Sequence, residues 1–389
     1  MRIVRRMTVL SAWVLCLLMI ISLIGCSGKD PSKSDSNGGA KPDKYYVGFA
    51  GALTGASAQD GESGLEGVKL GIELINREGG IDGVPLELII SDDKGDPKEA
   101  AIVANKFVQD SRVLAVIGHY NSSCTLAGAP IYNDAGLVEI AFGSTSPAVT
   151  DAGPYTFRTV PSDDIGARVS AKWGFDNYDI KKAAIIFENN DYGFGVSKIF
   201  QEECQAVGVE VVANENFIPG ETTDFTTMLT KIKNENADVI LLGTLYNETA
   251  MICKQAINLG LDVPYVGVDA LYNYPLIELG GEAVEGLTFA AFYSAESDDP
   301  VVQEFVKKYK EMWNDRTPSC YSAYAYDALS CIIDAIRANG PTREGIKEYL
   351  TTMEGQHGVS GINSFDENGD VIKSTIIIQV KDGDFVIIE

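Results

Sequence analysis

Histidine is almost absent from this 389-residue sequence, which contains only His119 and His357. A zinc site built on histidine needs ligands at short regular spacings, so these two residues give no basis for one. A serine hydrolase needs a general base beside its nucleophile and a third group that orients the base. His119 lies three residues before Ser122, the sequence contains no G-x-S-x-G elbow, and we therefore expect a protein that is not an enzyme.

Basic residues are also few, with 31 Lys and Arg against 55 Asp and Glu and a formal net charge of −24. This acidic balance argues against nucleic acid and anionic lipid as partners. The cysteines that follow residue 26 are odd in number and irregularly spaced, which argues against a disulfide framework. Cys320 and Cys331 bracket one helical segment and would lie about 16 Å apart, beyond disulfide reach.

The first 26 residues have the order of a secretory signal. Arginines at positions 2, 5 and 6 precede an apolar run from 9 to 24. The ending LIGC resembles the bacterial lipobox, in which the cysteine is diacylated and becomes the mature N-terminus. We expect a signal peptide over 1–25, a lipid on Cys26 and a flexible polar tether over 26–43. An uncleaved membrane anchor is the alternative, because the run is nearly long enough to span a bilayer.

Residues 44–389 are too many for one compact core and suit two lobes. Apolar strand segments alternate with amphipathic helical segments, the pattern of a parallel sheet covered by helices. The sequence predicts strands at 46–50, 86–90, 114–117, 138–141 and 156–159, then a second series at 183–187, 209–212, 239–242 and 265–268. Two such series, each starting its own sheet, predict an α/β protein with two lobes rather than one barrel.

Two polar loops follow neighbouring predicted strands. The strand over 114–117 is followed by Asn121, Ser122, Ser123 and Thr125, where a helix must begin. A helix start carries unpaired N–H groups and partial positive charge, so hydroxyls placed there suit a carboxylate. The second loop, residues 143–146, follows the strand over 138–141. Because open α/β sheets bind ligands at the carboxyl ends of their strands, we predict a ligand cradle here. A capped helix with nothing bound is the alternative.

Motifs spread over most of the chain resemble the leucine/isoleucine/valine-binding protein family, the substrate-binding component of branched-chain amino acid ABC transporters. The matching segments are GALTG with QDG (51–61), INREGGIDG (75–83), SDDKGDPKEA (91–100), VIGHYNSSCT (116–125), DYGFG (191–195) and DFTTMLTKIKNENADVI (224–240). The resemblance implies a type I periplasmic-binding fold, in which two Rossmann-like lobes with parallel sheets are joined by three crossing strands. The lobes would comprise 44–162 with 291–370, and 163–290 with 371–389.

The resemblance also implies roles for single residues. Ser122, Gly143 and Thr145 match the family's donors to the ligand carboxylate, and Ser144 lies in the same loop. Asp269, just past the strand over 265–268, matches the acid that receives the ligand ammonium, where many relatives have glutamate.

Three further positions complete the implied site. Tyr192 matches a tyrosine that touches the ligand from the second lobe, and Tyr246 lies one place beyond another. Asp60 stands where close relatives have a large aromatic residue, which leaves leucine as ligand open. Either Asp60 receives a polar or basic ligand side chain, or it turns outward to solvent.

We therefore expect a lipid-anchored, extracytoplasmic receptor that captures an amino acid, of the branched-chain or aliphatic class by resemblance, and delivers it to ABC permease subunits. It would be a monomer that needs no cofactor or metal, has no nucleic-acid partner and touches the membrane only through its lipid. A sensor for another small polar amino acid, amide or carboxylate is the alternative, because the same fold serves both roles. A hydrolase using Ser122 or Ser144, a dinucleotide site at Gly193-Phe194-Gly195 and a calcium loop over 366–370 have weaker support.

Overall fold

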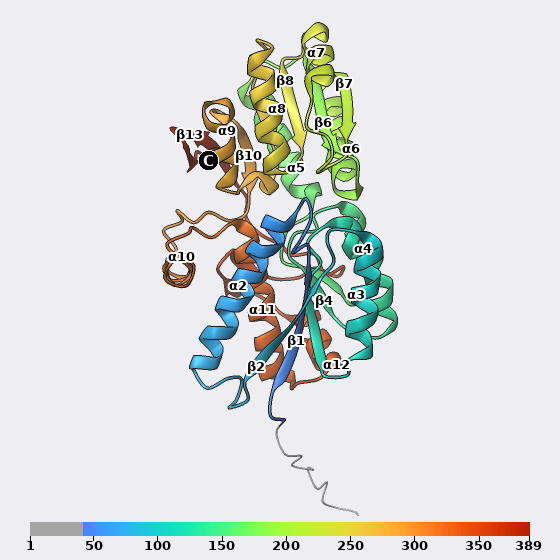
Figure 1. The fold of residues 1–389 in the computed structure, drawn as a ribbon, viewed down its shortest axis with the longest axis vertical. Helices are drawn as coiled ribbons and strands as arrows, with labels where there is room; N and C mark the ends of the chain where they lie inside the picture. Colours follow the sequence, from blue (N-terminus) through green and yellow to red (C-terminus); the bar gives the residue numbers. More distant parts are fainter. Residues whose placement is uncertain (1–41) are drawn as a thin grey trace, which may run out of the picture. The chain divides into compact units, whose positions relative to one another are not determined.

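Two sheets organise the chain, one in each of two lobes (Figure 1). The computed structural model describes residues 42–389, so the predicted signal peptide, Cys26 and the predicted tether up to residue 41 lie outside the described residues. Within the described range, one sheet has five strands and the other has seven, and β11 (Gln356–Gly358) pairs with β12 (Gly361–Asn363) in a separate hairpin. The prediction of an α/β fold with two Rossmann-like lobes is confirmed.

The first lobe contains a fully parallel sheet with helices on both faces. In spatial order its strands are β2 (Leu86–Asp92), β1 (Tyr45–Gly51), β3 (Val113–Ile117), β4 (Glu139–Ala141) and β5 (Thr156–Arg158). The helices around it are α2 (Ala58–Arg77), α3 (Pro97–Gln109), α4 (Ser122–Asp134), α10 (Pro300–Met312), α11 (Cys320–Asn339) and α12 (Arg343–Thr352), with the 3-10 helix η1 (Pro147–Asp151). One face packs against α2 and α11 and the other against α3 and α4, which explains the unbroken apolar strands.

The second lobe contains a sheet whose outer edge is antiparallel. In spatial order its strands are β14 (Asp384–Ile387), β13 (Ile376–Lys381), β10 (Thr288–Ala291), β9 (Tyr265–Gly267), β8 (Val239–Gly243), β6 (Lys182–Glu188) and β7 (Glu210–Phe217). The pairs β10 with β13 and β13 with β14 are antiparallel, and the others are parallel. The helices are α5 (Asp163–Asn177), α6 (Asp191–Val207), α7 (Thr226–Glu235), α8 (Tyr246–Asn258) and α9 (Pro275–Gly280), with η2 (Asp269–Leu271) and η3 (Gly281–Val284).

The chain passes between the lobes at three places. It leaves the first lobe after β5 and enters α5, returns after β10 to reach α10, and leaves again near residue 371 to form β13. Before the third passage, Asp370 bridges to Arg158 at the end of β5. Arg158 is buried and binds both carboxylate oxygens of Asp370 at 2.6 Å, so an ion pair joins the first and third passages.

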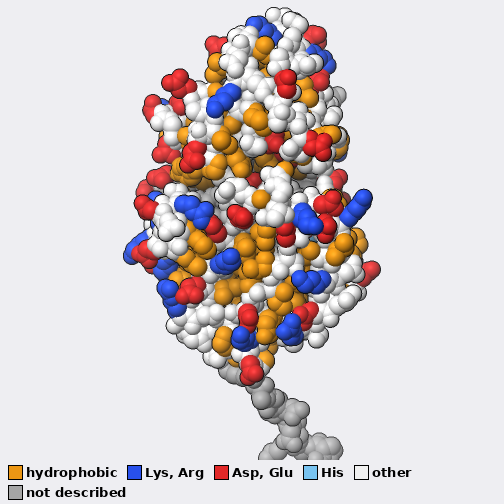
Figure 2. All heavy atoms as spheres, viewed as in Figure 1, with side chains coloured by type: hydrophobic (Ala, Val, Ile, Leu, Met, Phe, Trp, Pro, Cys, Tyr) orange, Lys and Arg blue, Asp and Glu red, His pale blue; other side chains and the backbone are white. Residues whose placement is uncertain are grey.

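The distribution of surface charge and the state of the cysteines match what the composition and the cysteine spacing predict. Figure 2 shows lysine and arginine side chains scattered among acidic ones on the face it displays, without a continuous basic patch. Within residues 42–389 the cysteines are free and buried, as the irregular spacing predicts. No helix in the described part of the chain is long and apolar enough to span a membrane.

Candidate functional site

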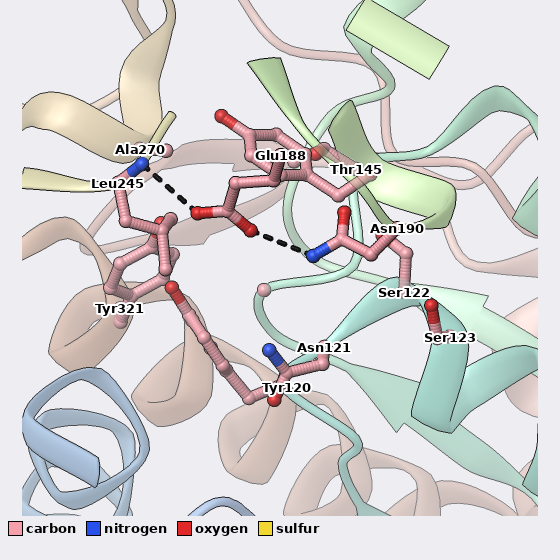
Figure 3. A pocket seen from close by; sticks show the side chains of 12 residues that line it. Tyr120, Asn121, Ser122, Ser123, Thr145, Glu188, Asn190, Leu245, Ala270 and Tyr321 are labelled. Atoms are coloured by element: carbon pink, nitrogen blue, oxygen red, sulfur yellow. Dashed lines mark hydrogen bonds between the residues drawn. The ribbon is translucent and has the colours of Figure 1, made fainter. Parts of the chain in front are cut away.

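A pocket lined by residues of both lobes lies where strands of both lobes end. The first lobe contributes the loop after β3 and the start of α4, the loop after β4, and the start of α11. The second lobe contributes the carboxyl ends of β6, β8 and β9. The lining residues are Tyr120, Asn121, Ser122, Ser123, Gly143, Thr145, Glu188, Asn190, Tyr192, Leu245, Ala270 and Tyr321 (Figure 3).

The start of α4 presents polar groups to the pocket. The helix begins at Ser122, and its N-cap residue Asn121 makes no side-chain capping bond: its amide nitrogen donates to Ser57 Oγ at 3.1 Å, and its Oδ1 is buried without a partner. Ser122 Oγ accepts a hydrogen bond from Ser146 N at 3.2 Å, which ties the helix start to the second polar loop. An uncapped helix start with hydroxyls beside it favours an anionic group of a ligand.

The second polar loop packs tightly against the first. A Cβ atom on Gly143 would lie 2.3 Å from the Tyr120 ring, so only glycine lets the loop approach this closely. Thr145 lines the pocket, and its hydroxyl is buried without a hydrogen-bond partner. A buried unpaired hydroxyl is unfavourable, and a ligand that bonds to it would remove that penalty.

Ser144 lies apart from the lining residues. Its hydroxyl is buried, shares a hydrogen bond of 2.6 Å with Thr125 Oγ1 and donates to Tyr120 O at 3.1 Å.

The ring of His119 is bonded at Nδ1 to Asp93 at 2.6 Å and at Nε2 to Tyr132 at 3.3 Å. His119 therefore acts as a buried structural residue and is engaged away from both serines.

From the second lobe, Tyr192 lines the pocket and donates to Thr244 O at 3.4 Å. It lies in the first turn of α6, where Gly193 packs on the end of β6: a Cβ on Gly193 would lie 2.0 Å from Glu188 O. Tyr246 is half-buried at the start of α8 and is not among the lining residues. The structure thus brings Ser122, Gly143, Thr145 and Tyr192 to one pocket.

Asp269 and Asp60 lie just behind the pocket wall. Asp269 is buried at the start of η2, next to the lining residue Ala270, and accepts a hydrogen bond from Tyr324 OH at 3.4 Å. Burial raises the pKa of its carboxyl to about 7.

Asp60 is also buried, so the alternative in which it turns outward to solvent is wrong, and Asp60 is not among the lining residues. Its carboxylate accepts hydrogen bonds from Tyr120 OH at 3.0 Å and from Asn273 Nδ2 at 2.6 Å. Because Asn273 belongs to the second lobe, this bond holds the lobes together. Burial raises the pKa of Asp60 to about 7.

Glu188 is the one acidic lining residue that our sequence reasoning missed, and the other missed lining residues are Tyr120, Asn190, Leu245, Ala270 and Tyr321. Glu188 ends β6, is 2% exposed, and accepts hydrogen bonds from Asn190 Nδ2 at 2.7 Å and from Leu245 N at 3.3 Å (Figure 3). Burial raises its pKa to about 8. The signal was present, because Glu188 directly follows the predicted strand over 183–187 and strand ends were already used to place the cradle.

Comparisons with known proteins agree with this geometry. A family described as periplasmic binding protein matches residues 44–384. A Leu/Ile/Val-binding protein homolog of Brucella abortus is 33% identical over 337 residues, which cover 86% of this chain and 89% of that protein.

Two solved structures are similar over nearly their whole length. A leucine-binding protein from Thermotoga maritima is 30% identical, with a TM-score of 0.82 and coverage of 89% of this chain and 98% of that one. A branched-chain amino acid transporter substrate-binding protein from Streptococcus pneumoniae, solved with isoleucine, is 28% identical, with a TM-score of 0.82 and coverage of 88% and 97%.

Proposed function

The chain belongs to the periplasmic binding protein family, and from this we propose that it captures an α-amino acid between its lobes and delivers it to an ABC permease. It is a binding protein, not an enzyme, so binding and closure constitute its mechanism. Closure around a ligand removes water, buries the ligand charges and creates the surface that a permease recognises.

The observation that supports this proposal is the pairing of unbonded polar groups at the start of α4 and in the second polar loop with a nearby buried acid. We propose that an α-carboxylate binds to Ser122, to the Thr145 hydroxyl and to the uncapped start of α4. Asp269, behind Ala270 in the second lobe, is the proposed partner of the α-ammonium. An α-amino acid carries both charges, and branched-chain amino acids are the ligands for which the similar proteins are named.

We also propose that the mature protein begins at a diacylated Cys26 and is held at the outer face of the cytoplasmic membrane as a monomer. The lipobox-like ending LIGC and the polar segment that follows it support this. The family supports an extracytoplasmic location.

Thermal-shift measurements over a panel of amino acids, small amides and carboxylates test the ligand class, because a ligand that binds only the folded state raises the melting temperature. For the tightest ligand, isothermal titration of Asp269→Asn should show affinity about 10- to 150-fold weaker, since hydrogen bonds to charged groups contribute about 1.5 to 3 kcal/mol. Asp110→Asn serves as the control, because Asp110 is a half-buried acid before β3 that pairs with Arg112 and is not among the lining residues. Unchanged binding in Asp269→Asn would exclude Asp269 as the ammonium partner.

A further inference from the structure

The pocket contains one acidic side chain, and no cation is bonded to it. Glu188 is the one acidic or basic residue among those that line the pocket, and its two bonded donors, the Asn190 amide and the Leu245 backbone, are both neutral. The Glu188 carboxylate lies between the walls formed by Tyr321 and Leu245 on one side and Asn190 on the other (Figure 3).

The acids around the pocket are not neutralised by hydrogen-bonded cations either. Asp60 bonds to the neutral groups of Tyr120 and Asn273, and Asp269 bonds to the hydroxyl of Tyr324. Asp163, the first residue of α5, has one buried carboxylate oxygen without a partner and donates its backbone N–H to Thr145 O at 2.9 Å.

The buried cations nearby already have acidic partners. Arg158 forms a bidentate ion pair with Asp370, and Lys373 Nζ lies 3.8 Å from Asp327 Oδ2. Neither lines the pocket. A zwitterion with an uncharged side chain adds no net charge to this acidic region, so it would leave the buried Glu188 without the cationic partner that would allow its carboxyl to ionise.

Resting on the proposed function, we infer that the amino acid bound here has a cationic side chain, and that Glu188 accepts its positive group. The same ligand would place its α-carboxylate against Ser122 and the free hydroxyl of Thr145, and its α-ammonium toward Asp269. A basic side chain exchanges water for a charge-assisted bond to Glu188, which an aliphatic side chain cannot make. Glu188 thereby selects basic over branched-chain amino acids.

Isothermal titration with lysine, arginine, glutamine and leucine tests this on the wild type, Glu188→Gln and Glu139→Gln. Glu139 is the matched control because it is an equally buried carboxylate, bonded by Thr156 in the first lobe and not among the lining residues. Lysine or arginine should bind the wild type at least about 10-fold more tightly than leucine. Glu188→Gln should weaken that binding about 10- to 150-fold and leave leucine within about 3-fold, while Glu139→Gln should change neither.

Melting temperatures establish that each variant folds. If Glu188→Gln does not fold, Glu188→Asp replaces it in the test, and this variant should retain the preference for basic ligands because it keeps the carboxyl group. Leucine binding tighter than lysine and arginine, and insensitive to Glu188→Gln, would overturn the inference and leave the proposed function standing. Glutamine binding as tightly as lysine in both the wild type and Glu188→Gln would overturn the cationic assignment in favour of a neutral donor. If no amino acid in the panel binds, the proposed function itself fails.

Discussion

Replacing Asn273 by alanine removes the bond that the second lobe makes to Asp60 and should destabilise the closed state without unfolding either lobe. The bond joins Asn273 Nδ2 to Asp60 Oδ1 at 2.6 Å, and both residues are buried. Since the ligand binds between closed lobes, a weaker closed state appears directly as weaker binding.

The magnitude depends on the charge of Asp60, whose pKa is raised to about 7 by burial. At pH 8 the carboxylate is mostly ionised, and a hydrogen bond to a charged group contributes about 1.5 to 3 kcal/mol, so affinity should fall about 10- to 150-fold. At pH 6 it is mostly protonated, and a neutral bond of about 0.5 to 1.5 kcal/mol predicts a loss of about 2- to 10-fold. The ratio of the variant Kd to the wild-type Kd should therefore increase with pH.

Isothermal titration with the tightest ligand of the panel, at pH 6 and pH 8, measures this ratio. Asn76→Ala is the control, because Asn76 makes a comparable pair of amide bonds to Leu86 entirely within the first lobe. It should lower the melting temperature and leave the Kd unchanged. A Kd ratio of one for Asn273→Ala at both pH values would refute the role of this bond in closure, and an equal loss in Asn76→Ala would show that general destabilisation is the cause.

Three further predictions concern the anchor, the cleft and the response to pH. Cys26→Ala should release the protein from the membrane fraction while the lobes still fold, and an unmodified chain that still begins at Met1 would contradict the lipoprotein assignment. Tyr192→Ala should weaken binding without unfolding the protein, and in the wild type saturating ligand should reduce the radius of gyration in solution scattering; an unchanged radius would argue against closure. The ligand-free protein should lose stability as pH rises from about 4 to about 8. Burial raises the pKa values of four carboxyls to about 7 or 8, so over this range the folded state binds more protons than the unfolded state. These carboxyls belong to Asp60, Asp163, Glu188 and Asp269. Denaturant unfolding at pH 5 and pH 8 measures it, and stability that increases over this range would contradict the assignment.

The parallel strands of both lobes were predictable because strands covered on both faces appear as short unbroken apolar runs. Helix α5 was harder to predict from the sequence. It faces the sheet with Gly166, Ala167, Ala171 and Gly174, and Gly174 lies so close to β9 that a Cβ atom would meet Val266 at 3.0 Å. Small residues allow this close packing but give only a weak amphipathic pattern, so the helix is not visible as an apolar stripe.

The pocket was predictable in part, and the limit is physical. Ser122 and Thr145 follow neighbouring strands of one sheet, so the strand-end rule alone places them together. The approach of Asp60 to Asn273 depends on how the two lobes meet, and no periodicity within either lobe contains that information. The strand-end rule could also have placed Glu188 at the pocket, but that Tyr321, from the helix that starts at residue 320, lines the same pocket depends on how the two lobes meet.

The three passages between the lobes also determine when the chain can finish folding during synthesis and export. Helix α2 packs against α11, so the first lobe waits for a segment about 250 residues further along the chain. The second lobe completes its sheet only when β13 pairs with β10 and β14 pairs with β13. Contacts this distant in sequence form slowly.

Neither lobe can therefore close its core on a partly synthesised chain. A chain that remains unfolded until its last strands are available is suited to threading through a secretion channel, and it then folds where its ligand is found. The same interleaving ties the two lobes into one folding unit, so a destabilising change near β14 should delay both.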